Sequence, residues 1–143
     1  MAEMSDYLED ELVDHIFRTA TFTKPTVLAI ALLITAADDD DTGQFSTSTG
    51  VEVTNANAYA REARNPLDAN WEASVDGMTE NIAAITFTQA TGSWGSVVAM
   101  AIVDSASYDA GNLLFHSTVG ISRTIDNGDT AEFAATALTI TFD

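Results

Sequence analysis

The sequence has very few basic residues. It contains five Lys and Arg against 22 Asp and Glu, giving a formal net charge of -17 over 143 residues. Such a chain repels phosphate backbones and anionic membrane surfaces, so we expect neither nucleic acid nor membrane as a partner. A folded protein with this charge also repels itself in dilute buffer. Two explanations remain open: adaptation to concentrated salt, which screens the repulsion, or solubility at high local copy number. A single lysine, Lys24, with Asp in excess of Glu is typical of halophilic surfaces.

Cysteine is absent, which excludes disulfides and thiolate metal sites. The sequence also lacks a Gly-x-Ser-x-Gly turn and a phosphate-binding Gly-Lys loop. We therefore expect no enzyme activity, no catalytic residues and no cofactor. The longest apolar run, Val27 to Ile34, is far shorter than the roughly 20 residues that span a bilayer. Because the acidic start lacks the pattern of a signal peptide, we expect a soluble protein, cytoplasmic when made.

Hydrophobic residues make up 46% of the chain, which predicts one folded domain over residues 1–143. An amphipathic helix is expected at residues 6 to 18, with Ser5 as its N-cap. Leu8, Leu12 and Ile16 recur every four residues, and Phe17 widens the stripe. We expect the first three of these side chains to be buried, against the sheet or a partner subunit.

The remainder of the sequence predicts strands. Residues 26 to 35 are apolar on both alternating faces, which is typical of a central strand covered on both sides, with the helix or a neighbouring subunit over one face. Asp126 to Asp129 contains Asn-Gly and predicts a type I′ hairpin. Further strands are expected at residues 51–54, 58–63, 82–88, 97–103, 113–118, 119–123 with a kink at Gly120, and 138–142. We predict a mainly β fold, an antiparallel β-sandwich with one N-terminal α-helix.

Three sets of residues are candidate ligand sites. The Asp38 to Asp41 run offers carboxylates to a Ca²⁺ ion, but consecutive Asp side chains cannot all face one ion, and a solvated loop is favoured. A zinc site would need the two histidines, His15 and His116, to be joined by Asp or Glu, and ordinary packing is favoured. We thus expect no metal site. Trp71 and Trp94 are candidates for stacking on a sugar, although packing at the sheet edge is the simpler interpretation for Trp94.

Several motifs in order along the chain resemble a family of small tailed-phage virion proteins, commonly labelled tail-fibre or structural protein. The motifs are Ser5-Asp6-Tyr7-Leu8-Glu9 through Arg18, Pro25 to Leu32, Tyr59-Ala60-Arg61, Ser93-Trp94-Gly95, Ile102-Val103-Asp104, Gly111 to His116, Asn127-Gly128-Asp129 and Leu138 to Phe142. The resemblance covers nearly the whole chain. The Asp38 to Asp41 insertion and the overall acidity depart from it, and resemble adaptation of the same fold to salt in a virus of a halophilic host.

The resemblance implies a structural virion component made in the host cytoplasm. The first hypothesis is a capsid decoration or cement protein, since the chain has no fibrous repeat or coiled-coil heptad with which to build a shaft. The alternative is a tail, baseplate or tail-fibre component, including a receptor-binding tip. The expected partners are the major capsid protein or other virion proteins, with a trimer as the favoured homo-oligomer. The interface candidates are Leu8, Leu12, Ile16, Phe17, Phe22, Trp71 and Trp94, with the loops at residues 38–50 and 67–78.

Overall fold

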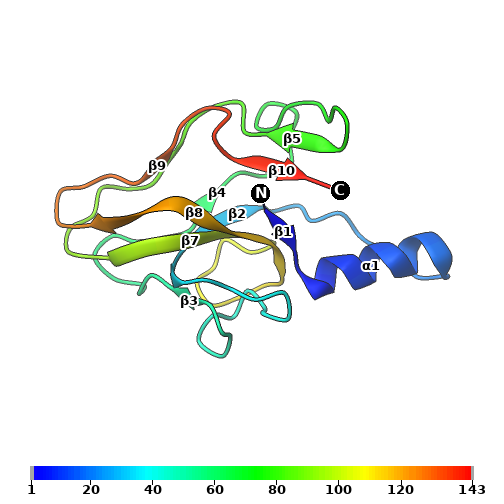
Figure 1. Ribbon diagram of the computed structural model, residues 1–143, viewed down its shortest axis with the longest axis horizontal. Coiled ribbons are helices and arrows are strands. Elements are labelled where there is room, and N and C mark those ends of the chain that lie inside the picture. The colour runs from blue at the N-terminus through cyan, green and yellow to red at the C-terminus, as the bar shows by residue number, and fades with distance from the viewer. Residues whose placement is uncertain (1, 143) are drawn as a thin grey trace.

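The computed structural model describes residues 2–142, and antiparallel strands make up most of its regular structure. The elements in chain order are β1 (Glu3–Met4), α1 (Asp6–Phe17), β2 (Ala29–Thr35), β3 (Val51–Glu52), β4 (Glu62–Ala63), β5 (Met78–Glu80), β6 (Ile85–Thr86), β7 (Gly95–Val103), β8 (Leu113–Ile125), β9 (Glu132–Phe133) and β10 (Thr139–Thr141). The predicted fold class, a mainly β antiparallel sandwich with one N-terminal helix, is confirmed (Figure 1).

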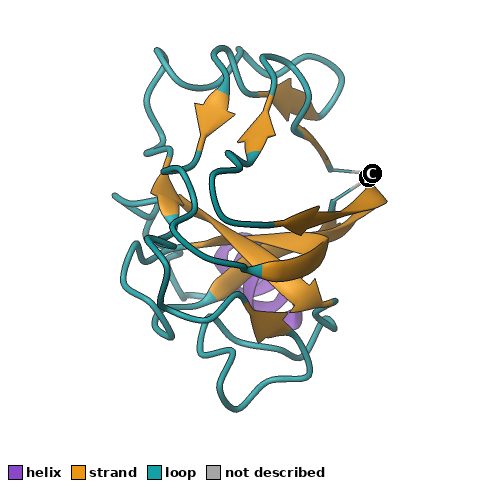
Figure 2. Cartoon of the chain, turned by 90° about the vertical axis from the view of Figure 1, so that its left-hand side faces the viewer, coloured by secondary structure: helices purple, strands orange, loops and turns teal. Residues whose placement is uncertain are grey.

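The main sheet is built on three long strands. Its order is β1-β8-β7-β2-β3, and β4 pairs with β2 beside β3. Two small sheets, β10-β5 and β6-β9, lie over one face of it, while loops lie over the other face (Figure 2). Among residues 2–142, no helix combines the length and the hydropathy needed to cross a bilayer.

Side-chain alternation along β2 divides the core into two parts. Ile30 and Leu32 point to one side, where they pack in a cluster with Ile85 of β6 and Ile140 of β10. Residues 29, 31 and 33 point to the other side, where Phe45 from the following loop covers them. The predicted two-sided burial of β2 is therefore confirmed. The helix contributes Leu8 to the first cluster, as predicted for one face, and the chain's own loop after β2 supplies Phe45 to the other.

The acidic turn at Asp126 to Asp129 forms, but not as a hairpin. The amide of Asp129 donates to the carbonyl of Asp126 at 3.0 Å, and Gly128 has a φ of 92°. The chain then leaves β8 and runs along the opposite layer, where β9 pairs with β6. The hairpin prediction was wrong because Asn-Gly specifies a local turn, whereas which strand pairs next depends on tertiary packing. The expected irregularity at Gly120 is present as a register shift between β7 and β8.

Candidate functional site

Helix α1 is attached firmly at its beginning. Ser5 is fully buried, its backbone amide donates to the carbonyl of Leu114 at 3.1 Å, and its hydroxyl accepts from the amide of Leu8 at 3.4 Å. The predicted N-cap is thus confirmed, and the helix ends within one residue of the predicted boundary. Leu8 is buried in the core, and Leu12 packs against the same cluster while remaining partly exposed. The first two turns therefore anchor the helix to the sheet.

The far end of α1 leaves the sheet. Figure 1 shows the helix projecting beyond the strands at one end of the molecule. Val13, Ile16 and Phe17, which share a face by their i, i+3, i+4 spacing, are 54%, 67% and 79% exposed. The sheet does not bury Ile16, because the hydrophobic stripe continues past the point where the helix loses contact with the sheet. Burial of Ile16 against a partner subunit stays a prediction. The exposed tip, which we define as Val13, Ile16 and Phe17, is an apolar surface with no partner inside the chain's described residues.

The remaining interface candidates lie elsewhere. Phe22 packs partly against the core, and its backbone amide donates to Nδ1 of His15 at 3.2 Å, so the chain after α1 folds back on the helix. Trp94 is 5% exposed, donates from Nε1 to the carbonyl of Asn57 at 2.9 Å and meets Tyr59 edge to face. Trp94 and the buried Leu8 are therefore core residues, and neither presents a surface to a partner or a sugar.

Trp71 differs from Trp94 because its ring is accessible. It lies with Leu67 and Phe142 among the residues that line an open, mostly apolar hollow of about 710 Å³. Its Nε1 is already used, since it donates to the carbonyl of Arg64 at 3.0 Å. The ring is thus fixed in orientation with its polar atom turned inward, which leaves only apolar contact for any molecule entering the hollow.

A buried ionic network holds the loops on the loop-covered face. The side chains of Arg61 and Glu52 are 0% and 1% exposed, and Nη2 of Arg61 lies 2.8 Å from Oε2 of Glu52. Arg61 also donates to the carbonyls of Gly43, Ser105 and Ala110 at 2.7, 3.1 and 2.7 Å. With the Nε–H donating to Oε1 of Glu52 at 2.9 Å, all five N–H groups of the guanidinium are satisfied internally. The network therefore fastens the loops and has no free proton donor for a substrate.

Tyr59 completes this network. Its hydroxyl donates to Oε1 of Glu52 at 2.8 Å and accepts from the amide of Leu32 at 3.0 Å. Burial is the main cause that raises the pKa of Tyr59 above its ordinary 10.0, with the Glu52 charge as the next. The phenol is consequently a fixed structural donor and stays protonated where free tyrosine would ionise.

The loops that Arg61 joins are closed by two aspartates. Asp41, 6% exposed, accepts from the amides of Asp38, Thr49 and Gly50 at 3.0, 2.6 and 2.7 Å. The prediction of a wholly solvated loop was wrong for this one member of the Asp38 to Asp41 run. The carboxylate of Asp109 accepts from the backbone amide of Ser46 at 2.8 Å and from the Ser46 hydroxyl at 2.7 Å. Both bonds lower the pKa of the Asp109 carboxyl, and the bond from the hydroxyl has the larger effect.

Two glycines allow these loops to touch. The amide of Gly43 donates to the carbonyl of Gly111 at 3.1 Å. A Cβ on Gly43 would lie 2.7 Å from the carbonyl oxygens of Ala110 and Gly111, and Gly111 has a φ of 88°. Side chains at either position would push the loops apart and away from Arg61.

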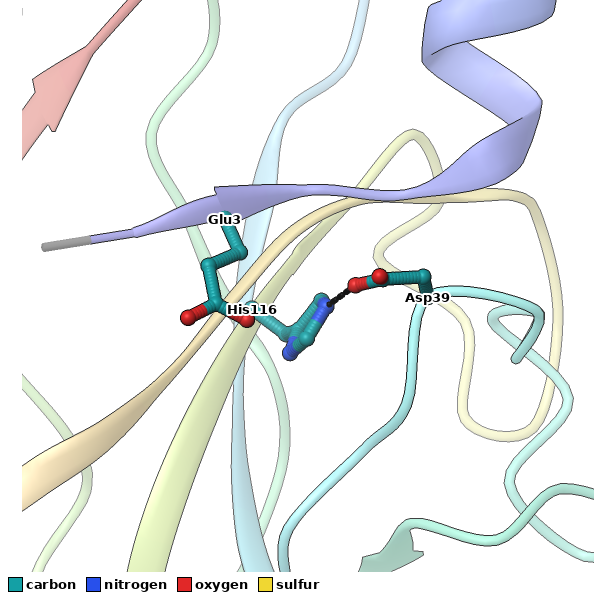
Figure 3. A group of neighbouring side chains, drawn as sticks. All are labelled: Glu3, Asp39 and His116. Carbon is teal, nitrogen blue, oxygen red and sulfur yellow. Dashed lines mark hydrogen bonds and ion pairs between the residues drawn. The ribbon is translucent and has the colours of Figure 1, made fainter. Parts of the chain in front are cut away.

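A third polar group lies beside the root of α1, where Glu3, Asp39 and His116 converge (Figure 3). Each offers one ligand atom, and the three atoms lie within 4.8 Å of one another. Nε2 of His116 is 2.8 Å from Oδ1 of Asp39. His116 is 6% exposed, whereas both carboxylates are exposed. The ring of His116 is buried, as ordinary packing predicts, but the edge of the ring faces the carboxylates of Glu3 and Asp39.

Sequence reasoning missed two of these groups for identifiable reasons. Glu3 belongs to a two-residue strand that has no periodic pattern, and its pairing with His116 exists only in the folded sheet. Glu52 and Arg61 stand nine residues apart in a stretch that reads as short strands separated by turns. The one available signal for this pair was Arg61 itself, because an arginine is rare in a chain with only five Lys and Arg.

The chain as a whole matches a known protein family. Residues 3–141 match the family described as Podophage GP4 fiber I protein gp80. The chain belongs to this family. The tailed-phage resemblance seen in the sequence is thereby confirmed, and the chain is a structural protein of a tailed phage. None of the curated proteins compared with the chain matches it.

Proposed function

We propose that this protein is a fibre-associated structural component of a tailed virion, attached to a neighbouring virion protein through the exposed tip of α1. The observation that carries the proposal is the helix itself, which is anchored at Ser5 and Leu8 and projects with Val13, Ile16 and Phe17 uncovered. Burying each such apolar side chain on a partner contributes about 1.5–3 kcal/mol. The description of the family, a fibre protein, supports a place on the tail rather than on the head.

The charge on α1 defines the chemistry of the partner. The helix has five carboxylates, namely Asp6, Glu9, Asp10, Glu11 and Asp14. A second copy of the chain would bring a further -17 against the same charge, so self-association through this face is disfavoured. We therefore infer that the helix docks in an apolar groove rimmed by Lys or Arg on another virion protein. A homotrimer, if formed, uses a different surface.

A capsid decoration or cement protein is the second candidate. It is supported by the lack of any element with which to build a shaft: the one helix described has 12 residues and the longest strand 13. A small β unit with a projecting helix suits a plug bound at many equivalent positions, and its partner would then be the major capsid protein. Both candidates use the helix for adhesion, and neither requires chemistry on a substrate.

The docking proposal is tested with variants that keep the fold. Ile16→Asp and Phe17→Asp place a carboxylate on side chains that are already largely exposed, so the isolated protein should keep its circular dichroism spectrum and melting temperature. We expect both variants to be missing from purified particles. Ile121→Asp is the matched control, because Ile121 is 70% exposed on β8. Normal incorporation of the helix variants would overturn the proposed attachment.

The location of the protein in the virion is tested separately, by labelling and by measuring its copy number per particle. A tag at an exposed loop should be seen at the tail in electron micrographs, with few copies per particle. Particles made without the protein should retain their DNA on heating but adsorb poorly to cells. Labelling over the whole head, a copy number comparable to the major capsid protein and loss of DNA on heating would instead establish the decoration role.

A further inference from the structure

The convergence of Glu3, Asp39 and His116 carries an inference that is independent of the virion role. We propose that these three side chains bind one divalent transition-metal ion of the zinc class, which fastens the root of α1 to the sheet. The three donors come from β1, from the loop after β2 and from β8, so a single ion would join three segments that lie far apart in sequence (Figure 3).

The position of the histidine is fixed by the fold. His116 pairs with Glu3 across the antiparallel β1–β8 ladder, which places both side chains on the same face of the sheet. The His116 side chain is 8% exposed and that of Asp39 is 60% exposed. A buried imidazole beside accessible carboxylates is the arrangement in which an ion enters from the solvent side and finds its nitrogen ligand already held in place.

The geometry fits a tetrahedral ion with small adjustments. Zinc bonds to nitrogen and oxygen are about 2.0–2.2 Å long, so tetrahedral ligand atoms lie about 3.4 Å apart. Here Nε2 of His116 and Oδ1 of Asp39 are 2.8 Å apart, and all three donors are within 4.8 Å. An ion between them would open the first distance slightly and draw the third donor inward. Three protein ligands leave one position for water.

The charge around the three ligands also favours a cation, because Asp6, Asp38 and Asp40 add to the two ligand carboxylates. An open pocket of about 450 Å³ lies at this position, and five of its seven lining residues are acidic: Glu3, Asp6, Asp38, Asp39 and Asp40. None of the residues that line it is Lys or Arg. The pocket therefore concentrates negative potential on the three donors with no basic side chain to balance it.

The donor set selects the class of ion. Calcium and magnesium prefer oxygen-only sites, whereas imidazole with carboxylates suits zinc and its first-row neighbours. The bound ion would also have a structural effect on α1, since the backbone carbonyl of Asp39 accepts from the amide of Asp6 at 2.8 Å. The same loop thus contacts the ion with its side chain and the first residue of the helix with its backbone.

Calorimetric titration of the chelator-treated protein with Zn²⁺ tests the proposal. It is carried out in about 1 M monovalent salt, where the Debye length is about 3 Å and diffuse attraction to the acidic surface is suppressed. We expect one ion per chain, not displaced by an equal concentration of Mg²⁺. Substitution by Co²⁺ should give the visible absorption of a four-coordinate ion with a nitrogen ligand. Binding should also raise the melting temperature.

Matched variants decide between a site and general acidity. Glu3→Gln and Asp39→Asn each remove one ligand at an exposed position and should weaken Zn²⁺ binding at least about tenfold. Asp40→Asn removes the same charge from the same pocket without removing a ligand and should change affinity by no more than about twofold. Equal affinities in all four proteins, or several ions displaced by Mg²⁺, would overturn the proposal and leave the group as a hydrogen-bonded His–Asp pair.

Discussion

Replacing Arg61 by Met tests whether the buried network, rather than the sheet alone, determines stability. The substitution keeps the approximate length of the side chain and removes every donor. Glu52 would remain at 3% exposure with its charge no longer paired, and three loop carbonyls would lose their partner. Removing one partner of a buried ion pair costs about 3–5 kcal/mol. That is a large part of the roughly 5–15 kcal/mol by which a domain is stable.

Equilibrium unfolding in urea provides the measurement for Arg61→Met. We expect the free energy of unfolding to fall by about 4 kcal/mol, with an m-value close to that of the unmodified protein. The double variant Glu52→Met/Arg61→Met should recover part of this loss, because it removes the unpaired carboxylate. Recovery should be incomplete, since the carbonyls of Gly43, Ser105 and Ala110 still lack their donor.

The matched control is Arg18→Met. Arg18 pairs with Asp14 at 3.4 Å, but the two side chains are 73% and 48% exposed, so the loss should stay below about 1 kcal/mol. A loss of that same size for Arg61→Met would refute the reasoning. A double variant no more stable than Arg61→Met alone would show that the unpaired charge of Glu52 is not the source of the cost.

Three further outcomes follow from charge and burial. If the net charge of -17 is an adaptation to salt, the melting temperature should rise from dilute buffer to molar monovalent salt, and an unchanged midpoint would contradict this. Leu8→Asp should unfold the chain, because Leu8 is 4% exposed and burying a carboxylate costs several kcal/mol, as circular dichroism would report. Above about pH 10 the unfolded state loses the Tyr59 proton while the folded state keeps it, so Tyr59 should lower stability by about 1.4 kcal/mol per pH unit. Tyr59→Phe should lower stability near neutral pH and reduce this slope in pH-dependent urea unfolding, leaving the smaller contributions of Tyr7 and Tyr108, whose pKa values burial also raises.

The parts of the fold that the sequence predicts well are those with local causes. Ser5 followed by acidic residues specifies a helix start, and the structure has the cap at that residue. The sequence of β2 is apolar on both faces, so both faces must be covered by other residues. The structure has a hydrophobic cluster on each face. Such signals depend on near neighbours in the chain, so they do not require knowledge of the topology.

What the sequence does not predict depends on pairings between distant segments. The short strands β9 and β10 follow β8 in the chain, yet neither pairs with β8: β9 pairs with β6, and β10 pairs with β5. Likewise Ile16 continues the periodic stripe of Leu8 and Leu12 but lies beyond the sheet. The candidate metal ligands are separated by 36 and 77 residues along the chain, and no spacing rule connects them before the β1–β8 ladder is formed.

The acidity of the chain has opposite consequences for folding and for docking. Salt screens repulsion within the chain, so it should favour the folded state. Salt equally screens attraction between the carboxylates of α1 and a basic rim, so it should slow the encounter with the partner. Only the apolar contacts of Val13, Ile16 and Phe17 keep their strength in concentrated salt, because the hydrophobic effect does not require an unscreened charge. A virion protein that assembles in molar salt therefore needs an exposed apolar helix tip in addition to its charges, and this chain has one at the end of its most acidic element.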